Sequence, residues 1–210
     1  MARAKREWYP GAMYHVMSRG NRRLVLYQDE EDYITFLEYV NRAKELYPFI
    51  LHSICLMTNH FHMIIETIDD ELWKIMSKIL HSYAMYFNHK YDYTGHLFEK
   101  RYTACIIKDE RYFSEVSRYI HLNPVKAKMV DDAIDYKYTS YYLFVNDGSC
   151  VRSGKVYDEI NKLIKTDKLL CLFGNNRELY KAFVEEKKAH LEHESVIQKD
   201  IKEDDMWLPI

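Results

Sequence analysis

Two apolar, strand-like segments with a very short connection constrain the fold of this chain more than any other feature. The segments are residues 49–57 and 60–67, and only two residues lie between them. A connection this short joins antiparallel neighbours, so the sequence predicts a β-hairpin within an antiparallel sheet. In the second segment His60 and His62 are two residues apart, and they are therefore expected to face the same side of the sheet.

The histidine pair predicts a metal site, because two imidazoles directed at one point bind a divalent ion when oxygen ligands join them. Phe61, Met63 and Ile65 alternate with the histidines and are expected to pack on the opposite face. The alternative interpretation is a pair of half-buried histidines at a strand end. Short motifs have many false positives, so the pattern alone leaves both interpretations open.

The rest of the first 145 residues alternates between strand and helix patterns. The elements expected are strands at 14–18, 49–57, 60–67 and 96–108, and helices at 29–47, 69–88 and 109–122. The last helix is expected to end before the pair Asn123 and Pro124, because a residue that precedes proline avoids helical angles. This order predicts an α+β fold, a ferredoxin-like sandwich of helices on a mainly antiparallel sheet.

Turn-forming residues divide the chain into two parts. Asp147-Gly148-Ser149 and Ser153-Gly154 predict a loop, and residues 155–190 that follow have helical patterns. We expect one domain over residues 1–150 and a helical C-terminal extension over residues 151–210. A length of 210 residues is suitable for one ordinary domain with a small appendage.

Composition excludes several classes of protein. An apolar fraction of 48% is too high for a disordered chain. The four cysteines form no CxxC pair, which predicts reduced thiols and a cytoplasmic location. No apolar run is long enough to span a membrane. The net charge of -2 does not indicate nucleic acid, but basic residues outnumber acidic ones within 1–23 and within 100–128, as in phosphate-binding surfaces.

Several segments, in the same order, resemble the REP-associated tyrosine transposases, a branch of the HUH superfamily of single-tyrosine transposases that act on single-stranded DNA. The segments that carry this resemblance are residues 9–16, 18–23, 55–62, 95–102 and 118–127. The resemblance covers residues 1–145, and residues 167–183 resemble a helical extension found in many members. Three positions depart from the family pattern: Thr58 replaces a frequent proline, Thr103 a common lysine and Lys128 a frequent glycine.

The resemblance implies a chemistry and a set of site residues. Tyr119 would attack a phosphodiester of single-stranded or hairpin DNA and form a 5′-phosphotyrosine link. His60, His62 and Asn123 would hold Mg²⁺ or Mn²⁺, and hard oxygen with imidazole ligands suits these ions. The DNA target would be a hairpin such as a repetitive extragenic palindrome, bound by a monomer or a homodimer. The candidates for DNA-backbone contacts are Arg19, Arg22, Arg23, Lys100 and Arg101, for which ordinary surface charge is the alternative.

The residues themselves leave alternatives to this assignment. Tyr119 lies on the apolar stripe of its expected helix, where a tyrosine commonly belongs to the core. Tyr112, two turns earlier, is the alternative nucleophile, although it has no asparagine four residues on.

Four other histidines are not among the expected metal ligands. His121 is off the face shared by Tyr119 and Asn123 and is expected at the surface. His15 and His52 are expected in the core or at a sheet edge. His96 is expected to be structural, and a contact with DNA is the alternative.

Two other functions remain open at this stage. The chain could be a nucleic-acid-binding module without catalytic activity. It could also be a metal-dependent phosphodiesterase in which water is the nucleophile. A covalent protein–DNA adduct would distinguish the transposase from both.

Overall fold

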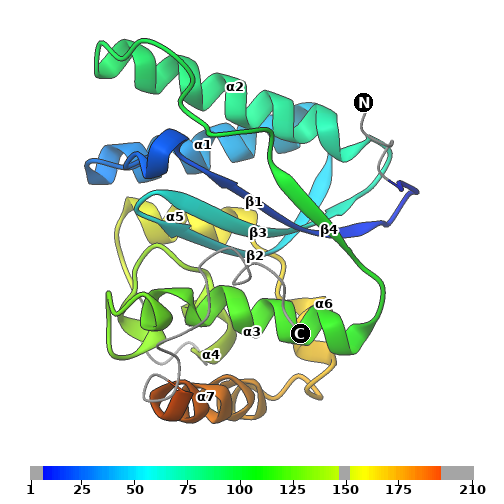
Figure 1. Cartoon of the computed structure of the whole chain (residues 1–210). Coiled ribbons are helices and arrows are strands. Elements are labelled where there is room, and N and C mark those ends of the chain that lie inside the picture. Colours follow the sequence, from blue (N-terminus) through cyan, green and yellow to red (C-terminus); the bar gives the residue numbers. More distant parts are fainter. Residues whose placement is uncertain (1–6, 147–151, 195–210) are drawn as a thin grey trace.

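The computed structural model describes residues 7–146 and 152–194, which form a four-stranded sheet between layers of helices (Figure 1). The strands, in the spatial order β2-β3-β1-β4, are β1 (Met13–Arg19), β2 (Phe49–Met57), β3 (His60–Thr67) and β4 (Thr103–Ile107). Every neighbouring pair is antiparallel. The predicted hairpin and the α+β class are therefore confirmed.

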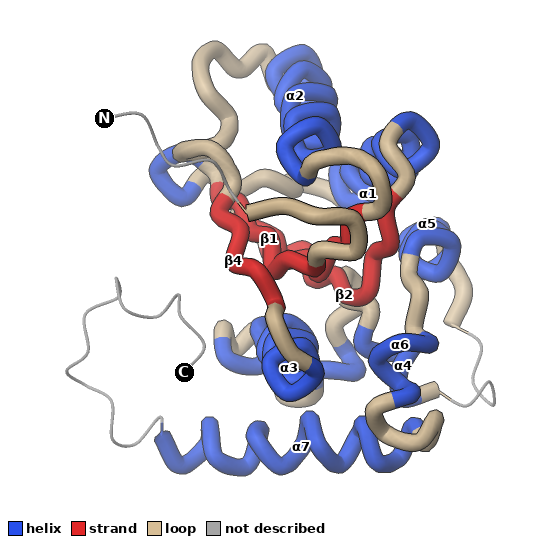
Figure 2. Tube along the Cα trace, turned by 90° about the vertical axis from the view of Figure 1, so that its right-hand side faces the viewer, coloured by secondary structure: helices blue, strands red, loops and turns tan. Residues whose placement is uncertain are grey.

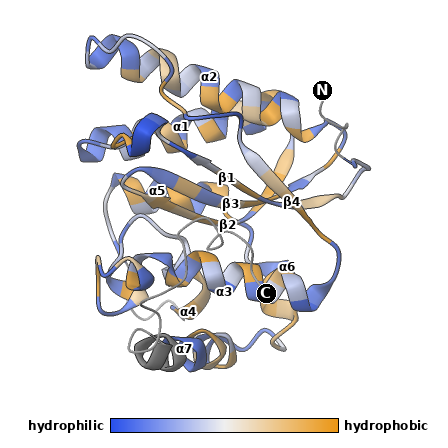
Figure 3. Ribbon diagram, in the orientation of Figure 1, coloured by the Kyte–Doolittle hydropathy of each residue, from blue (hydrophilic) through white to orange (hydrophobic). Residues whose placement is uncertain are grey.

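Helices cover both faces of the sheet. On one face lie α1 (Glu30–Leu46) and α2 (Leu72–Lys90), and on the other lies α3 (Glu110–Lys126) (Figures 1 and 2). Phe36 of α1 packs against Phe61 of β3, with ring centroids 5.0 Å apart. In α2 and α3 hydrophobic residues recur beside hydrophilic ones, as expected for amphipathic helices (Figure 3).

Aspartates at the beginnings of α1 and α3 explain where these helices start. Asp29 accepts a hydrogen bond from the backbone N–H of Asp32, and Asp32 accepts one from Asp29 in return. Asp109 accepts a hydrogen bond from the backbone N–H of Tyr112. Such bonds satisfy N–H groups that lack a partner within the helix, and the negative charge suits the positive end of the helix dipole.

Two predicted elements differ in the structure. The strand expected at 96–108 is confined to β4, because residues 97–99 bond only briefly to the chain at the end of β1, through the bridge between Gly20 and Phe98. Helix α3 continues through Asn123 and Pro124 to Lys126. Proline lacks one N–H, but burial of this part of α3 against its neighbours outweighs that loss.

The C-terminal part of the described chain is helical. It comprises α4 (Tyr141–Val145), α5 (Lys155–Leu163), α6 (Asp167–Cys171) and α7 (Arg177–Glu194), besides two short 3₁₀ turns, η1 (Asn21–Arg23) and η2 (Ala133–Asp135), earlier in the chain. Helix α5 packs on α1 beside the sheet edge formed by β2, and α7 packs on α3 and α4 (Figure 2). The predicted boundary near residue 150 lies outside the described residues.

The apolar residues of these C-terminal helices belong to the same core as the sheet. Val156 and Ile160 of α5 and Tyr180 of α7 are buried within it. Within the described residues, no helix is both long and apolar enough to cross a membrane.

Candidate active site between the sheet and helix α3

Three separate segments meet at the end of the sheet where β3 begins. Gly20, after β1, donates its backbone N–H to Asn59 in the hairpin turn, at 2.8 Å. Asn21 donates to Leu97 at 2.7 Å, which brings the segment before β4 to the same rim. A side chain at position 20 would lie 2.2 Å from the carbonyl oxygen of Leu24, so only glycine allows this approach.

His60 and His62 project from β3 toward α3, as their two-residue spacing predicts. Their ring centroids are 5.1 Å apart and their ring planes are nearly perpendicular. His62 is fully buried, whereas His60 lies at the rim and is partly exposed. The pair therefore combines one deep imidazole with one that solvent and ligands can reach.

Hydrogen bonds fix the orientation of both imidazoles. Nδ1 of His60 lies 2.7 Å from the amide oxygen of Asn59, which can only accept, so Nδ1 donates and Nε2 carries the lone pair. Nδ1 of His62 lies 3.0 Å from Nε2 of His15 on β1. When His62 donates in that bond, its Nε2 also presents a lone pair, which is the form that binds metal ions.

Burial keeps both histidines neutral. It lowers the pKa of His60 to about 4, aided by the charge of Arg19, and it lowers the pKa of His62 well below its usual value. Neutral imidazole is the state that binds a metal ion, so the pair is prepared for that role at neutral pH.

Tyr119 of α3 lies directly against the histidines. Its ring centroid is 5.5 Å from that of His62 and 5.9 Å from that of His15, and both contacts are edge-to-face. The ammonium group of Lys126, two turns further along α3, lies 4.7 Å from the centre of the Tyr119 ring. Burial raises the pKa of the Tyr119 hydroxyl, while hydrogen bonding by Asn123 and the charge of Arg19 act in the opposite direction.

Asn123 lies one turn after Tyr119 on the same side of α3. Its side-chain nitrogen donates to the backbone carbonyl of Tyr119 at 2.8 Å, and the residue is only 8% exposed. This bond uses the nitrogen end of the amide, so the oxygen end remains for another partner.

The donor set fits a divalent metal with mixed nitrogen and oxygen ligands. Two neutral imidazoles share one sheet face, and the amide of Asn123 belongs to the helix that covers this face. In the described part of the chain, no group of three or more His, Cys, Asp or Glu side chains could hold a metal ion. A metal at this site would therefore depend on oxygen from the amide and from a ligand, in addition to the two imidazoles.

The predicted DNA contacts are not all gathered at the histidines. Arg19 is close enough for its charge to affect His60, His62 and Tyr119. Arg22 and Arg23 are exposed in η1, next to this rim.

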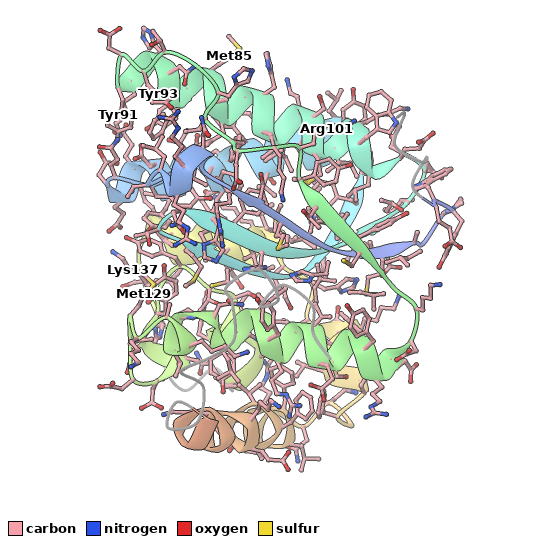
Figure 4. All side chains as sticks on the ribbon, in the orientation of Figure 1. Met85, Tyr91, Tyr93, Arg101, Met129 and Lys137 are labelled. Carbon is pink, nitrogen blue, oxygen red and sulfur yellow. The ribbon has the colours of Figure 1, made fainter. Side chains whose placement is uncertain are left out.

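Lys100 and Arg101 are exposed after the segment that bonds to the end of β1. Figure 4 shows Arg101 on the α2 side of the molecule, beside the beginning of β4. It therefore lies apart from the site beside α3.

The structure also places residues that sequence patterns did not assign to the site. Lys126 had a signal, because it is seven residues after Tyr119 and so lies on the same helix stripe. His15 had none, because its contact with His62 depends on how β1 and β3 pair. Tyr112, the alternative nucleophile, lies two turns toward the beginning of α3, near Cys105 of β4.

The prediction that His121 lies at the surface was wrong. It is fully buried, with Nδ1 2.7 Å from the hydroxyl of Tyr180 and Nε2 3.0 Å from that of Ser140. The reason is that α7 packs on α3 and that Tyr141 and Phe144 of α4 pack against the His121 ring. His15 and His52 are buried within strands, as predicted.

Comparisons with known proteins agree on one family. Residues 9–123 match the model of the family described as "Transposase IS200 like". A Haemophilus influenzae protein named as a REP-associated tyrosine transposase is 24% identical over 161 residues, which cover 68% of this chain and 86% of the relative. A solved structure of a REP-associated tyrosine transposase bound to a REP hairpin shares the fold, with a TM-score of 0.60, 19% identity, and coverage of 74% of this chain and 93% of that one.

The resemblance stated from the sequence is thus confirmed by a family match over more than half of the chain and by a relative of which 86% is covered. The chain belongs to the IS200-like transposase family, and it is a DNA strand-transfer enzyme related to the REP-associated tyrosine transposases.

Proposed function

We propose that this chain cleaves and rejoins single-stranded DNA beside a hairpin, through a covalent link between Tyr119 and a 5′-phosphate. The observation that carries the proposal is the position of Tyr119, edge-on to His62, with Asn123 one turn further along α3. A nucleophile beside a candidate metal site is the arrangement that phosphoryl transfer requires.

The reaction conserves the number of phosphodiester bonds. The hydroxyl oxygen of Tyr119 attacks phosphorus and loses its proton to solvent. The bond from phosphorus to the 3′ oxygen breaks, and that oxygen takes up a proton to become a free 3′-hydroxyl. The 5′-phosphate remains on Tyr119, and a 3′-hydroxyl can reverse the step without an external energy source.

His60, His62 and Asn123 would hold Mg²⁺ or Mn²⁺. When bound, the ion would act as a Lewis acid toward the scissile phosphate and orient it. Asn59 and His15 support this role, because hydrogen bonds donated through Nδ1 place the lone pair of each imidazole on Nε2.

Positive charge beside Tyr119 favours binding of the anionic substrate and formation of the phenolate that attacks it. Burial raises the pKa of Tyr119, so the phenol keeps its proton at neutral pH in the free protein. Hydrogen bonding by Asn123 and the charge of Arg19 lower the pKa of Tyr119 and so act against burial. Arg19 and Lys126, whose ammonium lies over the ring, would also attract the anionic phosphate.

Hairpin DNA is the proposed substrate. A protein of the same fold has been solved with a REP hairpin, which supports this class of DNA. Arg19, Arg22 and Arg23 at the rim are proposed to contact the DNA backbone, and Lys100 and Arg101 to contact a more distant part of it. The enzyme is proposed to act as a monomer or a homodimer in the cytoplasm.

A denaturing gel tests the covalent step. Labelled single-stranded hairpin DNA from the flanks of the gene is incubated with Mn²⁺ and the protein. Wild type is expected to yield a shifted, protease-sensitive band. Tyr119→Phe removes one oxygen and keeps the ring, so it should bind the DNA normally and form no adduct.

Tyr112→Phe is the matched control and should form the adduct. An adduct that persists in Tyr119→Phe, or that disappears only in Tyr112→Phe, would overturn the assignment. Cleavage without a protein-linked band would favour the water-dependent phosphodiesterase. Binding without any cleavage would favour the non-catalytic module.

A further inference from the structure

A chain of buried polar side chains connects helix α7 to helix α3. The hydroxyl of Tyr180 on α7 lies 2.9 Å from the hydroxyl of Ser117 and 2.7 Å from Nδ1 of His121, both on α3. All three residues are fully buried. Polar groups placed this deep are costly unless each is hydrogen-bonded, so the geometry of these bonds is closely specified.

The chain continues from α3 to the sheet at both of its ends. The hydroxyl of Ser117 lies 2.9 Å from that of Ser53 on β2. Nε2 of His121 lies 3.0 Å from the hydroxyl of Ser140, which in turn lies 3.0 Å from the backbone nitrogen of Ile54 and 3.3 Å from its carbonyl oxygen. The extension, α3 and β2 are therefore joined by one continuous polar path.

The available hydrogens set the direction of this path. Ser53 donates to Ser117, Ser117 to Tyr180, and Tyr180 to Nδ1 of His121. Nε2 of His121 then donates to Ser140, which donates to the carbonyl of Ile54. In this direction the hydroxyls of Ser117, Tyr180 and Ser140 each donate once and accept at least once. The reverse direction would lose the bond from Ser140 to that carbonyl.

Helix geometry connects this path to the reacting residues. Ser117 and His121 are one turn apart on one side of α3, and Tyr119 and Asn123 are one turn apart on nearly the opposite side, because each residue turns the helix by about 100°. A rotation of α3 by about 10° would displace an atom roughly 6 Å from its axis by about 1 Å. Displacements of that size can lower reaction rates strongly.

We propose that Tyr180, in the C-terminal extension, is a positioning residue for the cleavage reaction. Its hydroxyl binds two successive turns of α3 and thereby sets the rotation of that helix, which directs Tyr119 toward the histidines. The inference rests on the proposed function of Tyr119. The C-terminal extension would thus contribute to catalysis through helix α3.

The proposed positioning role depends on the hydroxyl of Tyr180, whereas the ring of Tyr180 contributes to packing. The ring packs against Phe173 and Phe144, with centroids 5.1 Å and 5.3 Å away. Phenylalanine at position 180 would keep these contacts. It would remove the common partner of Ser117 and His121 and leave both polar groups buried with one bond fewer.

The experiment measures the rate of adduct formation at saturating hairpin DNA, separately from the dissociation constant for that DNA. Tyr180→Phe is expected to lower the rate about tenfold and to leave the dissociation constant within about twofold of wild type. Val184→Ala is the control: Val184 is a buried apolar residue of the same helix, so its truncation loosens packing without touching the polar path. It is expected to retain the wild-type rate at temperatures where it is folded.

A second pair of measurements tests the path itself. Ser117→Ala should also slow the reaction, and the double variant with Tyr180→Phe should lose less than the product of the two single losses, because both remove the same bond. Hydrogen exchange of α3 backbone amides should be faster in Tyr180→Phe than in wild type, with α2 as the internal reference.

The outcomes separate this inference from the proposed function. A wild-type rate in Tyr180→Phe, or an equal loss in Val184→Ala, would overturn the positioning role. An unchanged exchange of α3 in Tyr180→Phe would overturn it even if wild type forms no adduct. The absence of an adduct with faster exchange of α3 would instead reject the chemistry of Tyr119 and retain the restraint on the helix.

Discussion

His60 and His62 have different surroundings although they share one face of β3. His62 is enclosed by β1, β2 and α3, and it contacts both His15 and Tyr119. His60 lies at the rim, oriented by Asn59 in the hairpin turn. The residue type and its spacing thus specify the shared direction of the two side chains. Their neighbours specify which nitrogen of each ring carries the lone pair.

Replacing either histidine should remove the metal affinity. His60→Ala and His62→Ala are each expected to weaken Mn²⁺ binding at least about tenfold and to abolish adduct formation, since a direct ligand matters at least as much as the groups that orient it. Isothermal titration calorimetry measures the affinity. His96→Ala, at an exposed position, is the control and should bind as wild type. Retained affinity in the double variant His60→Ala/His62→Ala would exclude this site.

At the level of elements, a β-bulge in β2 places a histidine beside a carboxylate near the C-terminal end of β3. The register of β2 against β3 shifts between Leu51 and Ser53, and His52 at this bulge lies 2.7 Å from a carboxylate oxygen of Glu66. Lys168 of α6 lies 2.8 Å from the same oxygen. Glu66 therefore joins β3 to β2 and to the C-terminal helices.

This link predicts a dependence of stability on pH. The hydrogen bond from His52, followed by that from Lys168, lowers the pKa of Glu66 from 4.5 to about 2. The folded state thus prefers the carboxylate, and its stabilising effect is present above pH 4.5 and lost as the pH falls toward 2. Glu66→Gln should lower the melting temperature at pH 7 by on the order of 5 °C.

Thermal denaturation of both proteins at several pH values provides the measurement. The difference between wild type and Glu66→Gln should shrink as the pH falls from 4.5 to 2. A difference that stays constant over this range would show that the Glu66 carboxylate is not stabilised by folding.

At the level of the whole molecule, segments that flank the C-terminal helices bond to the β2 edge of the sheet. The backbone N–H of Lys165 donates to Leu51 of β2 at 2.9 Å, and that of Leu56 donates to Tyr138 at 2.9 Å. Lys44 of α1 donates to the carbonyl of Leu163 at 3.0 Å. Both halves of the edge strand β2 are therefore occupied by later parts of the chain, which protects it from pairing with other molecules.

Removal of residues 155–210 is expected to leave a protein that is largely unfolded, with little or no cooperative melting transition. Each buried Val, Leu or Ile contributes about 1.5–3 kcal/mol, and the whole domain is stable by only about 5–15 kcal/mol. The truncation removes several such residues, including Val156, Ile160 and Leu163. Thermal melting followed by circular dichroism is the test.

A chain that ends at residue 194 retains all the described contacts and is the control for this truncation. Wild-type melting of the chain that ends at 154 would instead support the division expected from the sequence, in which a domain over residues 1–150 folds without the helical extension over residues 151–210.

The sequence by itself determined the features that depend on neighbours along the chain. Alternation over two residues predicted the hairpin and the shared face of His60 and His62. The helical period predicted α1, and it placed Tyr119 and Asn123 on one side of α3. These features are accessible because strand and helix periods relate residues that are only a few positions apart.

Only the tertiary structure decided the contacts between distant segments. His15 meets His62 across 47 positions because β1 pairs with β3, and His121 is buried because Tyr180, 59 positions later, covers it. The continuation of α3 past Pro124 likewise depends on packing that a local rule does not include. Local periods carry no information about which strands pair or which helices cover a face. Those choices minimise exposed apolar area and unsatisfied polar groups over the whole molecule at once.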